Sequence, residues 1–115
     1  GYDPNRPNGW EGIDEAGAVA PGEALSYELG ELPAGTYQIT MTEDPNAPGG
    51  DADLYLAVGR PASTSDWDER PYEYGSNEQV TLKLDAPATV HLMVYGYDQM
   101  DTERSAFHLS GQVAE

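Results

Sequence analysis

Apolar and polar side chains alternate along most of this chain, and that two-residue period limits the fold more than any other feature of the sequence. Successive side chains of a β-strand point to opposite faces, so alternation marks strands with one buried face. Apolar residues at the three- and four-residue spacing of a helix recur in no window of helical length. The expected inward positions are Leu25, Tyr27, Leu29, Tyr37, Ile39, Met41, Leu54, Leu56, Val58, Val80, Leu82, Leu84, Val90, Leu92, Val94, Phe107, Leu109 and Val113.

Six or seven short strands with turn signals between them predict an all-β chain, folded as an antiparallel sandwich or barrel. A length of 115 residues fits one domain. Residues 1–20 are rich in Pro, Gly, Asp, Asn and Glu, and we expect an acidic lead-in arm there, with room for a short strand at 16–20. Residues 21–115 are expected to form the sandwich itself. The abrupt start at Gly1 suggests a piece of a larger polypeptide.

The charge is one-sided: 21 Asp and Glu stand against 5 Lys and Arg, which gives a net charge of −16. Nucleic-acid phosphates and anionic membranes are bound mainly through Lys and Arg, so neither is an expected partner. No apolar run reaches the roughly 20 residues that span a bilayer. The acidic surface suits divalent cations, high-salt surroundings or solubility alone. The absence of cysteine excludes disulfides and thiolate-bound metals.

Nucleophilic catalysis has no support in the sequence. The chain has no cysteine nucleophile, and no Gly-x-Ser-x-Gly turn that would present a serine. His91 and His108 alternate with core positions, so we expect both on outer strand faces. Carboxylate pairs suited to glycoside hydrolysis exist by number alone in so acidic a chain. The sequence therefore predicts no catalytic residue and no enzyme.

Calcium is the cofactor that the acidic residues favour, because Ca²⁺ takes about six to eight oxygen ligands from carboxylates, amides and carbonyls in irregular loops. Asp3 and Asn5 in the lead-in arm are candidate ligands. Asp51 and Asp53, at the start of an expected strand, are the others. No EF-hand spacing supports either cluster, and the alternative is a solvated acidic surface without metal.

The stretch over residues 49–82 reads as a strand, a long loop and a second strand. Loops of this length are uncommon in compact domains and are usually functional or held down internally. Arginine is scarce in this chain, and Arg70 lies in the loop. Its expected carboxylate partners are Asp53, Asp68 and Glu78. We interpret this set as a structural clamp, so Arg70→Ala should cost roughly 3–5 kcal/mol; the alternative is an exposed pair contributing about 0–1 kcal/mol.

Aromatic rings are also concentrated in and around this loop. Rings on an exposed loop can stack on sugars or anchor a protein partner. The alternative is that half of them belong to the core or pack under the loop. The ligand-binding candidates are Tyr55, Trp67, Tyr72, Tyr74, Tyr95 and Tyr97.

Five short motifs occur in a characteristic order along the chain. They are Pro33-Ala34-Gly35, Gly50-Asp51-Ala52-Asp53-Leu54-Tyr55, Asp68-Glu69-Arg70-Pro71-Tyr72, Gly75-Ser76-Asn77-Glu78 and Gly96-Tyr97. With them, residues 22–111 resemble the bacterial pre-peptidase C-terminal domain. Many members of that family carry a cysteine pair where Glu69 and Val80 stand here. The resemblance therefore implies a loop without its covalent tie, held by Arg70 and a metal if one binds.

The resemblance implies a jelly-roll-like β-sandwich that serves as a non-catalytic accessory module of a secreted bacterial protease or other hydrolase. Such a module is extracellular, lies beside other domains of its parent chain, and binds protein or polysaccharide or assists secretion and folding. The family is similar to the calcium-dependent collagen-binding domains of bacterial collagenases, whose acidic arm ligates Ca²⁺. By that analogy Asp3 and Asn5 take the metal. The alternative function is a structural spacer without a ligand, stabilised by calcium if the metal binds.

Overall fold

The alternating segments all form β-strands in the computed structural model of the chain, which describes residues 10, 12–46, 50–71, 76–97 and 104–114. The predicted all-β class is confirmed. Within these residues no helix is long and apolar enough to cross a membrane. The strands are β1 (Ile13–Val19), β2 (Ala24–Leu32), β3 (Gly35–Glu43), β4 (Ala52–Val58), β5 (Glu78–Leu84), β6 (Ala88–Gly96) and β7 (Ser105–Val113).

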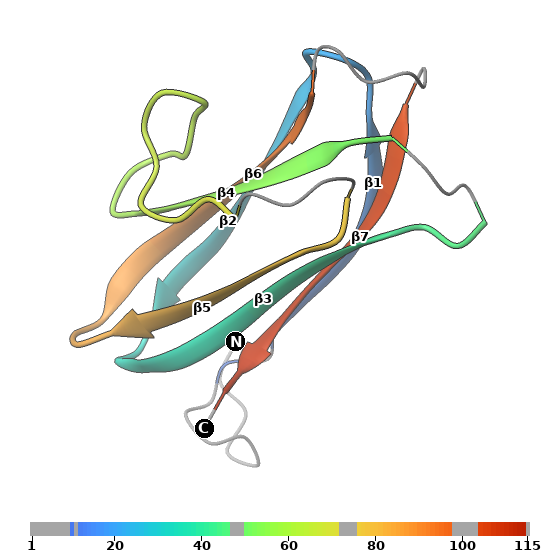
Figure 1. Cartoon of the computed structure of the whole chain (residues 1–115). Helices are drawn as coiled ribbons and strands as arrows, with labels where there is room; N and C mark the ends of the chain where they lie inside the picture. The colour runs from blue at the N-terminus through green and yellow to red at the C-terminus, as the bar shows by residue number, and fades with distance from the viewer. Residues whose placement is uncertain (1–9, 11, 47–49, 72–75, 98–103, 115) are drawn as a thin grey trace.

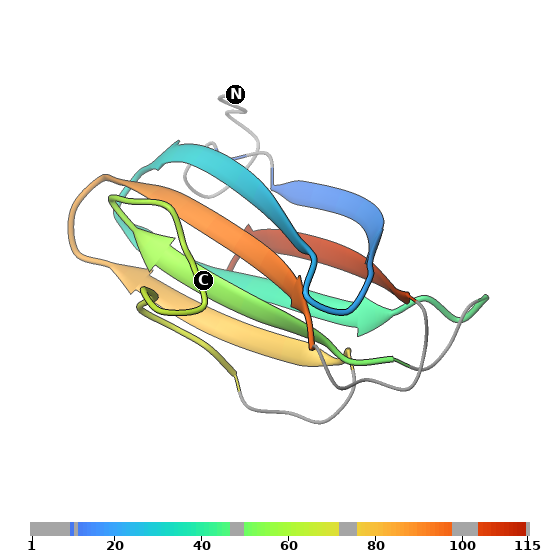
Figure 2. The same ribbon diagram turned by 90° about the horizontal axis from the view of Figure 1, so that it is seen from above.

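The strands form two sheets that pack face to face, so the fold is a sandwich (Figures 1 and 2). One sheet has four strands in the order β1-β7-β3-β5, and the other has three in the order β2-β6-β4. Within each sheet, all neighbouring strands pair antiparallel. Antiparallel sheets bury one face and leave the other for solvent or ligands, which is the pattern that the alternation predicted.

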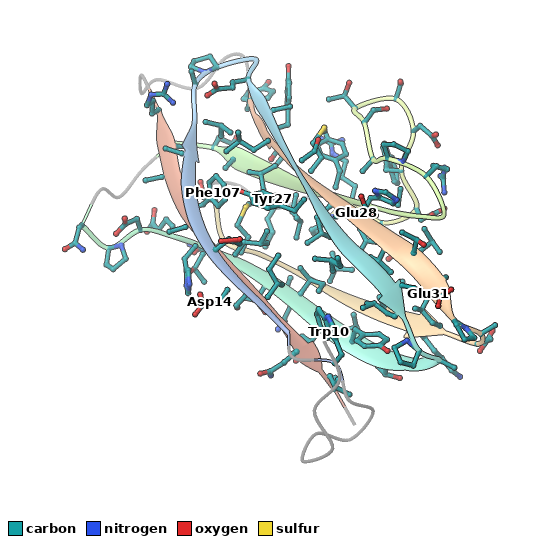
Figure 3. The ribbon with its side chains drawn as sticks, turned by 180° about the vertical axis from the view of Figure 1, so that it is seen from behind. Trp10, Asp14, Tyr27, Glu28, Glu31 and Phe107 are labelled. Atoms are coloured by element: carbon teal, nitrogen blue, oxygen red, sulfur yellow. The ribbon has the colours of Figure 1, made fainter. Side chains whose placement is uncertain are left out.

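The core lies between the two sheets and is built from the predicted inward positions. Tyr37, Ile39 and Met41 of β3 are fully buried. The inward residues of β6 are at most 1% exposed; they are Val90, Leu92 and Val94. Trp10 closes one end of this core and meets the Tyr37 ring edge-on, with 5.3 Å between ring centroids. Figure 3 shows Tyr27 of β2 and Phe107 of β7 directed toward each other between the sheets. Apolar burial of this kind supplies most of the stability of a small domain.

The lead-in arm departs from the prediction in its second half. Residues 13–19 form β1, which pairs with β7 along its whole length, so the sandwich begins before residue 21. The alternation is weak here because β1 packs through small residues. A Cβ atom on Gly17 would lie 2.8 Å from Cζ of Phe107 and 3.2 Å from the Tyr27 hydroxyl. A larger side chain at this position has no room, so the strand carries little apolar periodicity.

Both histidines lie on outer faces, as expected. His91 is on the outside of the three-stranded sheet, and His108 is exposed on the four-stranded sheet. The Nε2 atom of His108 is hydrogen-bonded to Oδ1 of Asp14 on the neighbouring β1 strand. Neither histidine is part of a buried catalytic arrangement.

Candidate functional site around strand β4

The free edge of β4 is closed by the long loop that follows it (residues 59–77). An edge strand normally presents a row of unpaired N–H groups to solvent. Here the N–H groups of four alternate β4 residues all donate to the loop or to the start of β5. The bonds are Ala52 N to Ser76 Oγ (3.0 Å), Leu54 N to Glu78 Oε1 (2.6 Å), Leu56 N to the Glu69 carbonyl (2.9 Å) and Val58 N to Asp68 Oδ2 (2.7 Å). The loop therefore completes the sheet edge without adding a strand.

The segment from Ser76 to Glu78 links both sheets. Ser76 is fully buried and Glu78 is 3% exposed, and each accepts one of the β4 bonds just described. Between them, Oδ1 of Asn77 accepts the N–H of Glu43 at the end of β3, at 2.9 Å. Three consecutive side chains thus satisfy backbone donors of two strands that lie in different sheets.

Gly50 fixes the entrance to β4 by a close backbone approach. Its φ is +84°, a region that side-chain-bearing residues rarely adopt. A Cβ atom there would lie 2.2 Å from Oγ of Ser105, and that same hydroxyl accepts the Asp51 N–H at 2.7 Å. Glycine is therefore required for the strand to begin where it does.

A charged cluster lies under the loop, on the face of β4 that points away from the core. Asp53 has a side chain that is 10% exposed, and its Oδ2 lies 3.8 Å from Nη2 of Arg70. The Arg70 guanidinium also stacks over the Tyr55 ring, 4.9 Å from the ring centroid. The carboxyl groups of Asp51 and Glu78 lie close enough to Asp53 to affect its proton affinity. The cluster holds three carboxyl groups and one guanidinium in a largely dry position.

Burial shifts the proton affinity of this cluster. Desolvation and, next, the nearby Asp51 charge raise the pKa of Asp53 to about 6 even though Arg70 opposes the shift. Desolvation also raises the pKa of Asp51. Two carboxyl groups that lie close together hold a proton more readily than separate ones. The pair therefore takes up a proton in mildly acidic solution.

The predicted clamp is brought together in part. Arg70 does pair with Asp53, and Glu78 lies beside them. Asp68 does not complete this set as predicted: its carboxylate accepts the Val58 N–H and is bound by Arg60, with Nη1 2.7 Å from Oδ2. The bond to Val58 places Asp68 at the end of β4, where Arg60 emerges.

Arg60 was missed by the sequence analysis. It binds Asp66 through Nη2 at 2.8 Å as well as Asp68, and it donates to the Val58 carbonyl at 3.0 Å. Hydrogen bonds from Arg60 lower the pKa of both Asp66 and Asp68. The signal in the sequence was the glycine before Arg60, followed by acids six and eight residues after it. In the structure Gly59 has a φ of +81° and forms the turn that directs Arg60 toward these acids.

The aromatic candidates divide by burial. Tyr55 is 3% exposed, so its predicted role in ligand binding is wrong: it packs with Ala57, Ala62 and Met93 in an apolar cluster under the loop. Tyr95 meets Tyr55 edge-on at 6.4 Å. Its side chain and that of Trp67 pack against this cluster and stay partly exposed. Tyr97 is 40% exposed. Two further candidates, Tyr72 and Tyr74, lie outside the described residues.

A groove lies on the outer face of the three-stranded sheet, between residues of β2 and β6 and the first part of the loop. Figure 2 shows this part of the loop beside the sheet. The volume of the groove is about 320 Å³. Glu28 and His91, which face each other across the β2–β6 ladder, contribute its polar groups. The lining residues are Ser26, Tyr27, Glu28, Pro61, Ala62, His91 and Leu92.

Two of the four calcium candidates, Asp51 and Asp53, lie among the described residues. Asp51 and Asp53 lie together, but the Arg70 guanidinium already provides the cation beside them. No group of three or more His, Cys, Asp or Glu residues suited to a metal occurs in the part of the chain that the structure describes. The other candidates, Asp3 and Asn5, lie outside the described residues. Calcium binding therefore stays a prediction.

Comparison with curated proteins points to proteases. No protein-family model matches the chain. It is 50% identical over 48 residues to the virulence metalloprotease of Vibrio anguillarum, covering 42% of this chain and 8% of that protein. It is 31% identical over 86 residues to alkaline serine exoprotease A of Vibrio alginolyticus, covering 75% of this chain and 16% of that protein. The chain thus spans only a small part of either relative.

Solved structures share the sandwich. The pre-peptidase C-terminal domain of collagenase from Bacillus anthracis has a TM-score of 0.64 at 16% identity, over 87% of this chain and 88% of that one. The segment named vEP C-ter 100 has a TM-score of 0.60 at 28% identity, over 85% and 87%. A periplasmic inhibitor of g-type lysozyme from Aeromonas hydrophila reaches 0.65 at 18% identity, over 92% and 89%. At 16% and 18% identity, the likenesses to the collagenase domain and to the lysozyme inhibitor show the fold alone.

These findings agree with the motifs. The protease relatives match in sequence, and the collagenase domain and vEP C-ter 100 match over nearly their whole length in structure. The resemblance and the accessory role expected from it are confirmed. The chain has the β-sandwich fold of a pre-peptidase C-terminal domain, and in sequence it matches a part of several longer proteases.

Proposed function

We propose that this domain is non-catalytic and attaches its parent protease to extracellular protein or polysaccharide. The observation that carries the proposal is that the acids around β4 are engaged in structure while the rings beside them stay accessible. Glu78 and Asp68 accept backbone N–H groups, and Asp53 pairs with Arg70. These contacts give the three acids structural roles at the edge of β4.

The proposed attachment surface (Trp67, Tyr95, Tyr97 and the groove) lies on the outer side of the three-stranded sheet. Tyr95 and Tyr97 are two residues apart, and Gly96 between them is buried. Trp67 packs beside Ala62, which also lines the groove. Partly exposed rings next to a groove with a few polar groups are typical of ligand surfaces.

The location of the chain is extracellular, as expected from the sequence. Its relatives include an alkaline serine exoprotease and a halolysin-like extracellular serine protease. Since each relative is several times longer than this chain, neighbouring domains of a larger protein are natural partners. The substrate of that larger protein remains part of the proposal.

The test is retention of the isolated domain on collagen, chitin and cellulose. We expect wild-type domain to be retained by at least one matrix and the Trp67→Ala and Tyr97→Ala variants to be retained less. Tyr97→Phe, which keeps the ring, should behave as wild type. Retention by no matrix would favour the spacer function instead. Hydrolysis of peptide or glycoside substrates by the isolated domain would overturn the non-catalytic role.

A further inference from the structure

The outer face of the four-stranded sheet has a different character from the rest of the molecule. Its central positions, which we call the neutral face, carry only hydroxyl and amide side chains: Gln38, Thr40, Gln79, Thr81, Ser110 and Gln112. They point outward because they alternate with buried core residues on β3, β5 and β7.

Strand register arranges these six side chains as a grid. Gln38 lies opposite Thr81 on one side and Gln112 on the other. Thr40 lies opposite Gln79 and Ser110 in the same way. Neighbouring strands are about 4.8 Å apart, and outward residues recur about every 6.7 Å along a strand, so the spacing is regular in both directions.

The absence of charge on these six positions contrasts with the net charge of −16. Ionisable groups of this sheet stand around the grid: Asp14 lies on the edge strand β1 opposite Ser110 (Figure 3), Lys83 opposite Thr36, and His108 opposite Thr42. A hollow of about 390 Å³ adjoins the grid at one corner; it is lined by Thr40, Met41, Thr42, Asn77, Gln79 and the largely buried Glu78.

We propose that the neutral face docks an uncharged, hydroxyl-rich polymer, that is, a neutral polysaccharide. A polymer laid on an acidic surface must strip water from carboxylates that it cannot neutralise, which is costly. On the neutral face that cost is absent. Hydroxyl and amide groups both donate and accept hydrogen bonds, so each can pair with sugar hydroxyls in either sense.

The inference rests on the proposed function, because it assumes attachment to insoluble material. It differs in placing the binding surface on the four-stranded sheet rather than on the three-stranded sheet. An anionic polymer would be repelled by the chain as a whole. A cationic one would find acidic groups elsewhere on the surface. Charge matching thus favours a neutral occupant for this face. Since no ion pair is involved, retention should not fall when salt is raised.

The experiment is depletion of the domain by cellulose and by chitin, with collagen in parallel, at low and high salt. Gln79→Glu combined with Gln112→Glu adds two charges on β5 and β7 without changing side-chain shape. Asn46→Asp is the control, because it makes the same isosteric change at an exposed turn position after the end of β3, outside the six grid positions. Thermal melts verify that all variants stay folded.

We expect the double variant to lose about tenfold or more of its affinity for the polysaccharide, while Asn46→Asp and added salt change little. Equal retention of double variant and wild type would overturn the inference. So would retention by collagen alone, or loss of polysaccharide retention only in Trp67→Ala and Tyr97→Ala, and either result would leave the proposed function standing. If wild type binds none of the three matrices, both proposals fall.

Discussion

The two ends of the long loop are held by the same chemistry in opposite surroundings. At one end Arg70 meets Asp53, with side chains 25% and 10% exposed. At the other end Arg60 meets Asp66 and Asp68, with side chains 37%, 56% and 40% exposed. The exposed end has the shorter contacts, at 2.8 and 2.7 Å against 3.8 Å. Contact length alone would therefore rank the two ends wrongly.

Surroundings decide how much each end contributes to stability. Exposed ion pairs are screened by water and salt, and most contribute little. In a dry position, the loss of one partner leaves an uncompensated charge or an unsatisfied N–H group, which is far more costly. We therefore expect the buried Arg70–Asp53 pair to contribute most of the stability that fixes the loop. The exposed Arg60 pairs should contribute little. The following changes test that comparison.

The largest effect is expected at Glu78. Glu78→Ala removes the acceptor of the buried Leu54 N–H and a partner of Asp53, and should lower the free energy of unfolding by roughly 3–5 kcal/mol. Denaturant titration measures the loss. Glu78→Gln keeps an acceptor oxygen and should retain much of the stability. If Glu78→Ala unfolds at the wild-type midpoint, the closed edge of β4 is unimportant for the fold.

Arg70→Ala is expected to come next, at about 2–3 kcal/mol. This lies below the range that the sequence suggested, because a quarter of the side chain still reaches solvent and its nearest carboxylate contact is long. The change also removes the stacking on Tyr55. Tm from circular dichroism gives the result. Arg70→Lys keeps the charge but loses the planar guanidinium, so its Tm should lie between those of wild type and Arg70→Ala.

The pH dependence of stability should differ between the two ends. Asp53 has a pKa of about 6 in the folded state against an ordinary 3.8, so the folded chain binds this proton more tightly than the unfolded chain. Stability from Asp53 then rises as pH falls from about 7 to about 4. The lowered pKa values of Asp66 and Asp68 act in the opposite sense, and their contribution is lost as pH falls below the ordinary value.

Thermal melts between pH 4 and pH 7 separate these contributions. Asp53→Asn should flatten the rise in Tm toward pH 4, whereas Asp66→Asn should leave that rise in place. Protonation of the many acids also reduces the repulsion caused by the net charge of −16, which raises Tm at lower pH. The slopes must therefore be compared between variants rather than taken from wild type alone. An identical slope in wild type and Asp53→Asn would mean that the buried pair does not titrate in this range.

The smallest effect is expected for Arg60→Ala, the matched change at the exposed end. Its Tm should fall clearly less than that of Arg70→Ala, and the difference from wild type should shrink further in high salt. A loss as large as that of Arg70→Ala would reverse the comparison and make Arg60 the main anchor of the loop.

The alternation of residues such as Tyr37, Ile39 and Met41 was enough to predict the sheets, because burial of one strand face leaves a local period. The pairing of Arg70 with Asp53 was also within reach, since few cations were available. The bond from Val58 N to Asp68 was not, because it depends on where the chain returns after a turn. Tyr55 was misjudged for a related reason: both faces of β4 are covered, and the sequence shows only one of them.

The closed edge of β4 affects how this domain can interact with extended peptides. A protease releases peptide fragments, and extended fragments add readily to any open sheet edge. Along β4 every second amide is already taken by a side chain or a carbonyl of the same molecule. An extended peptide therefore finds no template along β4, so this edge is closed to strand addition and to the aggregation that follows from it.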